Sequence, residues 1–265
     1  MKLTVIGCSG SMSGKHSAAS SYLLQAPGID ESGIERTFSV ILDLGPGAMG
    51  QSMNYVDPAL LDGIVLSHLH ADHCVDIVGM QVYRRWHPRG KMKQIPVVTP
   101  GNGLARTKAI AGDIDESDQI PEFKFVDVQP GDTAKLGPFS FEFFAALHTI
   151  EGLCVRVTGP SAADPTQQVV FTYSGDSDYC EGLVAAAQDA DLFLCEAAFD
   201  ATQEDVRGVH LTGGRAGTVA SEANAKRLVL THITPWANRE SILAAAQEHY
   251  ERLIDLAEPG LSIEF

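Results

Sequence analysis

The sequence predicts an α+β fold in which two β-sheets pack face to face and helices cover their outer sides. Its 265 residues divide into two strand-rich halves, and each half closes with helices. The chain has no short internal repeat and no linker between the halves, so a single domain over residues 1–265 is expected. A chain of this length can bury one large apolar core.

The first half alternates apolar strands with glycine-rich turns. Its strands are expected at residues 2–7, 21–25, 38–44, 63–67, 95–99 and 124–128, and its helices at 58–61 and 76–86. Asp76 is expected to cap the second of these helices. The acidic run 113–118 is interpreted as a solvated loop or a helix cap, because it lacks the glycine and terminal glutamate of a calcium loop.

The second half repeats this pattern of strands followed by helices. Short apolar runs predict its strands, and apolar residues at helical spacing predict its helices. The strands are expected at residues 139–144, 154–157, 169–173, 192–195 and 227–231, and the helices at 183–188, 215–225 and 239–256.

Composition narrows the class of protein. With 45% hydrophobic and 20% charged residues, the chain matches an ordinary globular protein. Its net charge of −15 opposes a phosphate backbone, so nucleic acid is an unfavoured partner. The five cysteines include no Cys-x-x-Cys pair, which favours reduced thiols in a cytoplasmic protein over a disulfide framework. No apolar stretch reaches the roughly 20 residues of a membrane helix, so no membrane partner is expected.

The stretch LSHLHADHCVD, residues 66–76, concentrates metal-type ligands on one turn. It lies where a buried strand is expected to open into a loop. Histidine and carboxylate side chains suit zinc and related divalent ions. The alternate spacing of His68 and His70 can turn both imidazoles to one side, while Asp72 and His73 follow on the turn and can reach a second ion. A chance grouping of loop histidines is the weaker alternative.

Three further candidates each follow a predicted strand. They are His148, Asp176 in a Ser-Gly-Asp turn, and His232. Any one of them alone is more often a hydrogen-bonded loop residue than a metal ligand. Because all three share the end of a core strand with the histidine-rich turn, we expect them to converge on one site.

Taken together, the ordered motifs resemble the metallo-β-lactamase superfamily and, within it, the ribonuclease Z-like branch. The match covers nearly the whole chain, with an Asp-x-Gly turn at 43–45, HLHADH at 68–73, His148, SGD at 174–176, HLTGGRAG at 210–217 and THITPW at 231–236. The resemblance implies a four-layer αββα sandwich with two divalent metal ions between the sheet edges. Zinc is the metal it implies first, and manganese or iron would suit the same ligands.

By the same resemblance, seven side chains would hold the two ions. His68, His70 and His148 would bind one ion, Asp72, His73 and His232 the other, and Asp176 would bridge both. The two ions would activate a water molecule for attack and offset the charge on a phosphoryl or carbonyl group.

The resemblance also implies a catalytic set of His210, Asp72 and Glu196. His210 matches the extra histidine of the phosphodiesterase branch, where a protonated imidazole donates to a phosphoryl oxygen or to the leaving alkoxide. Glu196 matches a family carboxylate that orients this histidine. A loop histidine beside the cap Thr212 and a solvated strand-end glutamate are the alternatives. Asp43 is either an acceptor for the free ring nitrogen of a zinc-bound histidine or a plain turn aspartate.

The spacing between two candidate ligands bears on the substrate. Transfer-RNA processing members of the branch carry a basic arm between the residues that match His148 and Asp176. In this chain those residues lie 28 positions apart, and Arg156 is the one Lys or Arg between them. The arm is therefore absent, and a large RNA is poorly supported.

The chain looks closest to the atypical cyclic-nucleotide phosphodiesterases of actinobacteria within this superfamily, judged by GCSGS, SHLHADH, YSGD, LCEA, HLTG and LTHITPW together. We therefore expect hydrolysis of cyclic AMP, with cyclic GMP as a further candidate, to the 5′-monophosphate. The alternative is a ribonuclease Z-type RNA 3′-processing endonuclease that lacks the arm. A non-catalytic binding protein is disfavoured, because all seven ligand positions are filled. The sequence does not set base preference.

Several residues carry no functional motif. His16, His87 and His249 are interpreted as surface residues, and core packing is the default for Trp86 and Trp236. A homodimer through the apolar side of the helix that contains Trp86 is left open.

Overall fold

The computed structural model describes residues 1–90, 92–112 and 119–265, which form two seven-stranded β-sheets. The first sheet has the order β14-β1-β2-β3-β4-β5-β6 and comprises Lys2–Gly7 (β1), Ser21–Ile29 (β2), Glu35–Leu42 (β3), Gly63–Val65 (β4), Ile95–Thr99 (β5), Phe123–Asp127 (β6) and Ser262–Glu264 (β14). The second has the order β13-β12-β11-β10-β9-β8-β7 and comprises Thr133–Leu136 (β7), Phe139–Ala145 (β8), Leu153–Pro160 (β9), Gln168–Tyr173 (β10), Leu192–Glu196 (β11), Leu228–Thr231 (β12) and Ile254–Leu256 (β13).

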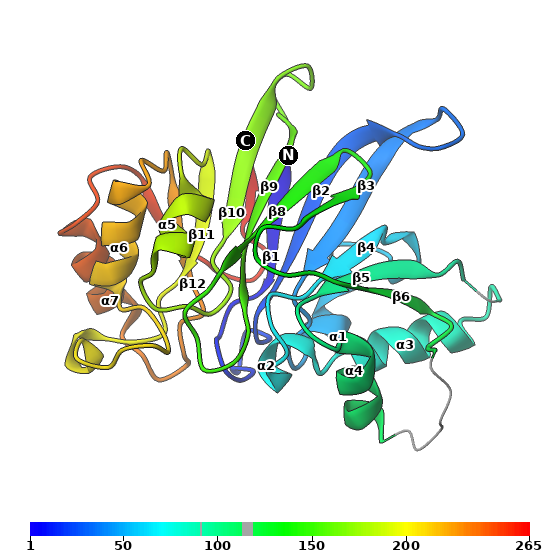
Figure 1. Cartoon of the computed structure of the whole chain (residues 1–265), viewed down its shortest axis with the longest axis horizontal. Coiled ribbons are helices and arrows are strands. Elements are labelled where there is room, and N and C mark those ends of the chain that lie inside the picture. The colour runs from blue at the N-terminus through cyan, green and yellow to red at the C-terminus, as the bar shows by residue number, and fades with distance from the viewer. Residues whose placement is uncertain (91, 113–118) are drawn as a thin grey trace.

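Helices lie on the outer side of each sheet, as Figure 1 shows. Those of the first half are Ala48–Ser52 (α1), Ala71–Cys74 (α2), Ile77–Trp86 (α3) and Gly103–Ala111 (α4), and those of the second half are Glu181–Ala187 (α5), Gly213–Glu222 (α6) and Arg239–Gln247 (α7). Short 3-10 turns occupy Pro58–Leu60 (η1) and Ala201–Gln203 (η2). The layers confirm the αββα sandwich that the sequence predicts.

The main apolar core lies between the two sheets. Side chains alternate along β8, so Phe139, Phe141 and Phe143 are buried while the polar residues between them are exposed. These rings belong to one cluster with Leu24 of β2 and Val40 of β3. Burial of such side chains stabilises the fold by about 1.5–3 kcal/mol each, and it fixes the face that each strand turns inward.

Two further apolar clusters attach the helices to the sheets. Val219 of α6 and Ile242 of α7 pack in a cluster with Phe193 of β11. On the other side, Met80 of α3 packs in a cluster with Ile41 of β3. Each helix layer therefore braces the sheet whose strand ends carry the candidate site.

Parallel strands bring the candidate residues to shared sheet edges. Strands β3 to β6 run parallel in the first sheet, and β10 to β13 run parallel in the second. Asp43 follows β3, His68 lies just beyond β4, Asp176 follows β10, Glu196 ends β11 and His232 follows β12. The carboxyl ends of parallel strands meet at one edge of a sheet, which is where α/β proteins place ligand sites.

The expected helix 239–256 is wrong in its second half. Helix α7 ends at Gln247, and the chain returns as strand β13, which pairs parallel to β12. The apolar spacing continues through Tyr250, but this side chain donates a hydrogen bond from its hydroxyl to the Ala225 carbonyl at 2.7 Å. Helical periodicity alone therefore missed the turn back into the sheet. Strands β7 and β14 and helices α1, α2 and α4 were not predicted; both strands are short edge elements.

The prediction that Asp76 caps the helix 76–86 is also wrong, because its side chain caps a different helix. Asp76 occupies the N-cap position of α3, but its side chain makes no capping hydrogen bond there. Its carboxylate instead accepts a hydrogen bond from the Met49 backbone N–H at 2.9 Å, so it caps helix α1. The carboxylate thus ties two helices of the first layer together.

Exposure settles several smaller expectations. Trp86 and Trp236 are 75% and 74% exposed, so core packing is wrong for both. All five cysteines are free thiols, and four of them are buried.

The acidic run 113–118 lies outside the described residues. Among the described helices, none combines the length and apolar character that crossing a bilayer requires.

Candidate metal centre

Three histidines form the first cluster of the candidate site. His68 Nε2 lies 3.1 Å from His70 Nδ1, and His148 Nε2 lies 3.1 Å from the same atom of His70. The alternate spacing therefore does turn both imidazoles of the strand end to one side, and the loop after β8 brings His148 to meet them. These three nitrogens lie close enough together to surround one ion.

Four side chains form the second cluster. Helix α2 is a single turn that presents Asp72 and His73, and His232 reaches them from the end of β12. His73 Nε2 lies 3.3 Å from His232 Nε2 and 3.4 Å from Asp72 Oδ2. His232 has a φ of 56°, and this left-handed backbone costs a non-glycine residue about 1–3 kcal/mol, which the surrounding fold must offset. Asp176 completes the group.

Asp176 lies between the two clusters. Its Oδ1 is 3.2 Å from His73 Nε2, and its Oδ2 is 3.2 Å from His232 Nε2 and 3.9 Å from His68 Nε2. The residue is 3% exposed, and Oδ1 makes no hydrogen bond of good geometry. A buried carboxylate oxygen that faces imidazole nitrogens in this way fits a shared cation better than a structural role. The donor set of histidine and carboxylate fits two divalent ions.

The charges of the second cluster compensate one another. Burial lowers the pKa of His73 and of His232, but nearby carboxylates, above all Asp176, outweigh it and raise the His73 pKa well above its ordinary value and the His232 pKa to about 10. Burial raises the pKa of Asp72, yet hydrogen bonds with His232 and His73 bring it below the usual range. The carboxylates thus create a strongly negative potential that a proton or a metal ion can satisfy, and metal binding must displace the protons.

The first cluster is electrostatically different. Burial, with help from the neighbouring histidines, holds the pKa of His68 well below its ordinary value, and burial followed by His148 lowers the pKa of His70. Neutral imidazoles are the form that binds metal. The lowered pKa values of His68 and His70 therefore favour cation binding at these two rings without prior loss of a proton.

Asp43 fixes the ring of His73. Its Oδ2 lies 2.7 Å from His73 Nδ1 and also accepts hydrogen bonds from the Ser67 and Tyr173 hydroxyls, at 2.7 and 2.8 Å. Its Oδ1 accepts from the Ser67 backbone N–H at 2.7 Å. Of the two interpretations left open by the sequence, the structure places Asp43 where it can accept from a ligand histidine. That contact keeps the proton on Nδ1 and leaves Nε2 for a metal.

The Asp-x-Gly turn also supports the ligand turn through its backbone. A Cβ at Gly45 would collide with the carbonyl oxygen of Asp72, so only glycine allows this approach. The middle residue of the Asp-x-Gly turn adds a hydrogen bond, because the Leu44 N–H donates to the His73 carbonyl at 2.7 Å. The turn after β3 therefore cradles the backbone of two candidate ligands.

His210 and Glu196 lie beside the second cluster. His210 Nδ1 is 2.9 Å from Glu196 Oε1, and the two residues group with His232. Glu196 is fully buried, so the solvated strand-end alternative is wrong for it. Burial lowers the pKa of His210, but the charge of Glu196 and the hydrogen bond to it raise the pKa above its ordinary value. Glu196 thus favours the protonated form of the imidazole, and His210 Nε2 is free of this contact.

Some supporting groups were missed by the sequence. The Val209 carbonyl accepts a hydrogen bond from His148 Nδ1 at 2.7 Å, and Ser67 and Tyr173 share Asp43. Tyr173 directly precedes the Ser-Gly-Asp turn, which was the one signal available in its case. A backbone carbonyl carries no signal in residue type.

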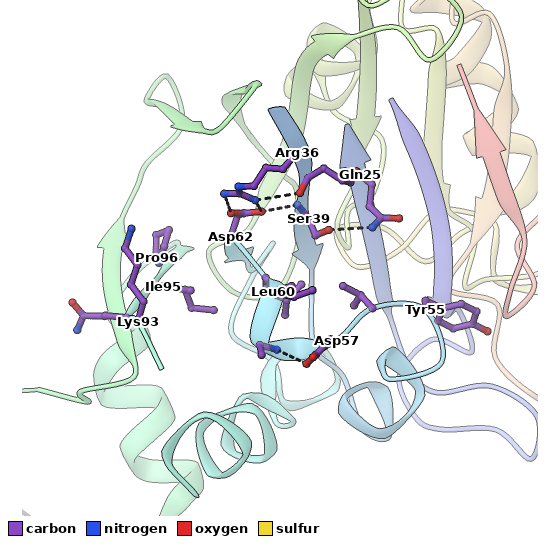
Figure 2. A pocket seen from close by; sticks show the side chains of 15 residues that line it. Gln25, Arg36, Ser39, Tyr55, Asp57, Leu60, Asp62, Lys93, Ile95 and Pro96 are labelled. Atoms are coloured by element: carbon purple, nitrogen blue, oxygen red, sulfur yellow. Dashed lines mark hydrogen bonds and ion pairs between the residues drawn. The ribbon is translucent and has the colours of Figure 1, made fainter. Parts of the chain in front are cut away.

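A pocket of about 760 Å³ lies elsewhere on the molecule (Figure 2). Its walls include residues of β3, η1 and β5, and the Arg36–Asp62 ion pair lies in its lining, with Arg36 Nη1 3.0 Å from Asp62 Oδ2. None of the residues of the metal clusters lines this pocket. Arg36 and Asp62 in its lining pair with each other, and Asp57 pairs with Arg89 outside the lining. The cluster of candidate metal ligands therefore points to the strand ends and not to this cavity.

Comparisons with known proteins agree with the geometry. A family model described as "Beta-lactamase superfamily domain" matches residues 39–233. An uncharacterized protein of Mycobacterium tuberculosis, Rv1339, is 36% identical over 256 residues, which cover 95% of this chain and 87% of the relative. "Ribonuclease Z" of Myxococcus xanthus is 27% identical, with 85% of this chain and 88% of the relative covered.

A solved structure is similar over the whole chain. "Probable metallo-hydrolase YhfI" of Bacillus subtilis is 29% identical in sequence, with 98% of both chains covered. Its crystal structure superposes with a TM-score of 0.83 and covers 100% of this chain and 99% of the other. The chain therefore belongs to the metallo-beta-lactamase superfamily, in the branch that contains YhfI and ribonuclease Z.

Proposed function

We propose that this probable metal-dependent hydrolase is a dinuclear-metal phosphodiesterase that opens a small cyclic phosphodiester. Cyclic AMP is the leading substrate, with cyclic GMP as a further candidate, and the product is the 5′-monophosphate. The observation that carries the proposal is the hydrogen bond between His210 and the buried Glu196, directly beside the cluster of His73, Asp176 and His232. A protonated imidazole in this place suits a reaction whose leaving group is an alkoxide.

The chain's own residues supply the parts of this reaction. Two bound divalent ions would polarise the phosphoryl group and activate the attacking water. As water adds to phosphorus and the bond from phosphorus to the 3′-oxygen breaks, His210 Nε2 donates its proton to that oxygen. Glu196 holds the other ring nitrogen at 2.9 Å and stabilises the imidazolium before the transfer. Zinc is proposed as the resident metal, because all seven donors are histidine or aspartate.

The connection between β9 and β10 favours a small substrate. His148 and Asp176 are joined by this antiparallel hairpin, in which Gln168 pairs with Pro160, and no arm extends from it. The net charge of −15 also opposes a polyanion. The alternative function is an RNA 3′-processing endonuclease that lacks the arm. The similarity to "Ribonuclease Z" supports this alternative.

The test is direct. Purified protein supplied with zinc or manganese is incubated with cyclic AMP, cyclic GMP and a precursor transfer RNA, and the products are separated by chromatography. We expect 5′-AMP from cyclic AMP well above the background of the Asp72→Ala variant. No 5′-AMP above that background would refute the proposal, and cleavage of the precursor at low enzyme concentration would favour the alternative.

A further inference from the structure

A second buried aspartate lies two residues beyond the proposed bridging ligand. Asp178 has a side chain that is 0% exposed, and it is not one of the expected metal ligands. Its Oδ1 accepts from the Tyr179 N–H at 2.7 Å and contacts Arg215 Nη1. Its Oδ2 accepts from the Gly208 N–H at 2.7 Å and from Arg207 Nε at 2.9 Å. Four donors therefore converge on one carboxylate.

Two of these donors, Arg207 and Gly208, belong to the loop of residues 200–210, which lies between β11 and α6. The base of the loop is closed by a hydrogen bond from the Phe199 N–H to the Leu211 carbonyl at 3.0 Å. Within residues 200–210 no residue is buried, so apolar packing contributes little to the position of the loop. Polar contacts from the protein body must fix it instead.

Arg215 of α6 makes further polar contacts with the same loop. Its Nη2 donates to the Val206 carbonyl at 3.2 Å, and its Nε lies 3.4 Å from Glu204 Oε1. The other oxygen of Glu204 accepts from the Thr212 hydroxyl at 2.6 Å. The side chain of Arg215 is only 7% exposed, so its charge depends on these partners.

Directly after Gly208, the loop places two groups at the candidate site. The carbonyl of Val209 holds His148 Nδ1, and His210 follows with its imidazole against Glu196. Gly208 has a φ of 77°, a left-handed backbone that glycine adopts without strain. Asp178 therefore binds the chain at the bend that aims the next two residues inward.

We propose that Asp178 and Arg215, here called the clamp, are positioning residues that place the 200–210 loop so that His210 can deliver its proton to the leaving oxygen. The inference rests on the proposed function for the role of His210, but the placement of the loop stands on the contacts themselves. The partners of Asp178 are Tyr179, Arg207, Gly208 and Arg215, and His210 is not among them. Asp178 acts on His210 through the Gly208 N–H and, with Arg215, through the loop backbone.

The kinetic test separates proton delivery from general damage. Asp178→Asn is assayed at saturating metal on cyclic AMP, whose leaving alkoxide needs a proton, and on bis(p-nitrophenyl) phosphate, whose leaving group does not. We expect kcat on cyclic AMP to fall by about 10- to 100-fold, the loss typical of a misplaced catalytic group, with little change in KM. Turnover of the activated ester should fall by far less. Equal losses on both substrates, or no loss on cyclic AMP, would overturn the inference.

Two further variants sharpen the kinetic result. Arg215→Lys keeps a cation near Asp178, so its cyclic AMP activity should lie between those of the parent and Arg215→Met. Asp255→Asn is the control, because it also removes a carboxylate partner of an arginine, Arg227 at 2.7 Å, but between strands β12 and β13. The control should keep the parent ratio of activities on the two substrates.

Hydrogen exchange tests the clamp without catalysis. In Asp178→Asn, peptides that cover residues 200–210 should exchange their amide hydrogens faster, in the metal-free and the metal-loaded protein alike, while peptides from β8 and β9 keep the parent rates. Unchanged exchange in the loop would overturn the clamp even if turnover fell. If the parent protein hydrolysed neither diester, the proposed function would fail, and the exchange result would still decide whether the clamp exists.

Discussion

The imidazole of His210 lies 2.9 Å from the carboxylate of Glu196, and Glu196 is in turn held by three backbone N–H groups. Ser177 donates to Oε1 at 2.9 Å, and Ala198 and Leu211 each donate to Oε2 at 3.2 Å. A carboxylate fixed from three sides cannot follow a moving ring, so it sets the orientation of His210. This geometry supports the proposed roles of His210 as the acid and of Glu196 as the carboxylate that orients it.

Replacing His210 by alanine should separate turnover from metal binding. His210 belongs to neither the first nor the second cluster, and its Nδ1 is occupied by Glu196, so His210→Ala should keep the parent metal content. Turnover of cyclic AMP should fall by about 10²- to 10⁴-fold, the usual contribution of a general acid. Steady-state kinetics and metal analysis on the same sample check both parts. Parent-rate hydrolysis by the variant would show that His210 is not the acid.

Glu196→Gln should shift the pH profile in a defined direction. Glu196 is the main group that raises the His210 pKa, and the active form of the acid is protonated. Without that negative charge His210 loses its proton at lower pH, so the alkaline decline of kcat/KM should move toward lower pH. Parallel profiles of the parent and the variant at saturating metal measure the shift. A decline that stays in place, or moves toward higher pH, would contradict the assignment.

His70→Ala should lose metal. Its Nδ1 is the atom to which both other nitrogens of the first cluster point, each at 3.1 Å, so no neighbour can replace it. We expect the bound metal to fall from two equivalents toward one, with loss of activity on both activated and unactivated diesters. His249→Ala is a matched control, because this histidine is exposed and belongs to neither cluster. Two retained equivalents in His70→Ala would exclude the ligand role.

The residues brought together at the site were largely predictable, because each lies in a short motif at the end of an apolar strand. His68, Asp176 and His232 stand out by residue type, and the direction of the strands is enough to bring them to one edge. Prediction succeeded where a local pattern and the parallel topology carry the same information.

The supporting contacts were not predictable, since they join residues that are distant in sequence. The Tyr173 hydroxyl reaches Asp43 across 130 positions, and Asp178 meets Gly208 across 30. Which aspartate caps which helix is also a tertiary fact, as the contact of Asp76 with Met49 shows. Edge strands such as β14 depend on their pairing partner more than on their own three residues.

The contact between Asp43 and His73 gives a prediction that depends on the tautomer of one ring. Asn suits the left-handed backbone at position 43, where φ is 60°, so Asp43→Asn should fold. The amide nitrogen, however, would face His73 Nδ1 as a donor, which forces the ring proton onto Nε2, or it would turn away and leave the Ser67 and Tyr173 hydroxyls with a poorer acceptor. In the first arrangement, His73 Nε2 carries the proton and can no longer bind a metal. In the second, the ring of His73 loses the contact that fixes its orientation.

We expect the affinity of one metal equivalent to fall by about 10- to 100-fold in Asp43→Asn, as for other groups that orient a ligand histidine, while the second equivalent is retained. The unfolding free energy should also decrease, by about 1–3 kcal/mol for the imperfectly paired buried groups. Metal titration and chemical denaturation measure the two effects. Asp62→Asn is the control, because Asp62 likewise accepts from a backbone N–H, that of Ser39 at 2.8 Å, but lies in the pocket of Figure 2. Since Asp62 has no contact with the clusters, only Asp43→Asn should weaken metal binding, and equal affinity in the two variants would remove the orienting role from Asp43.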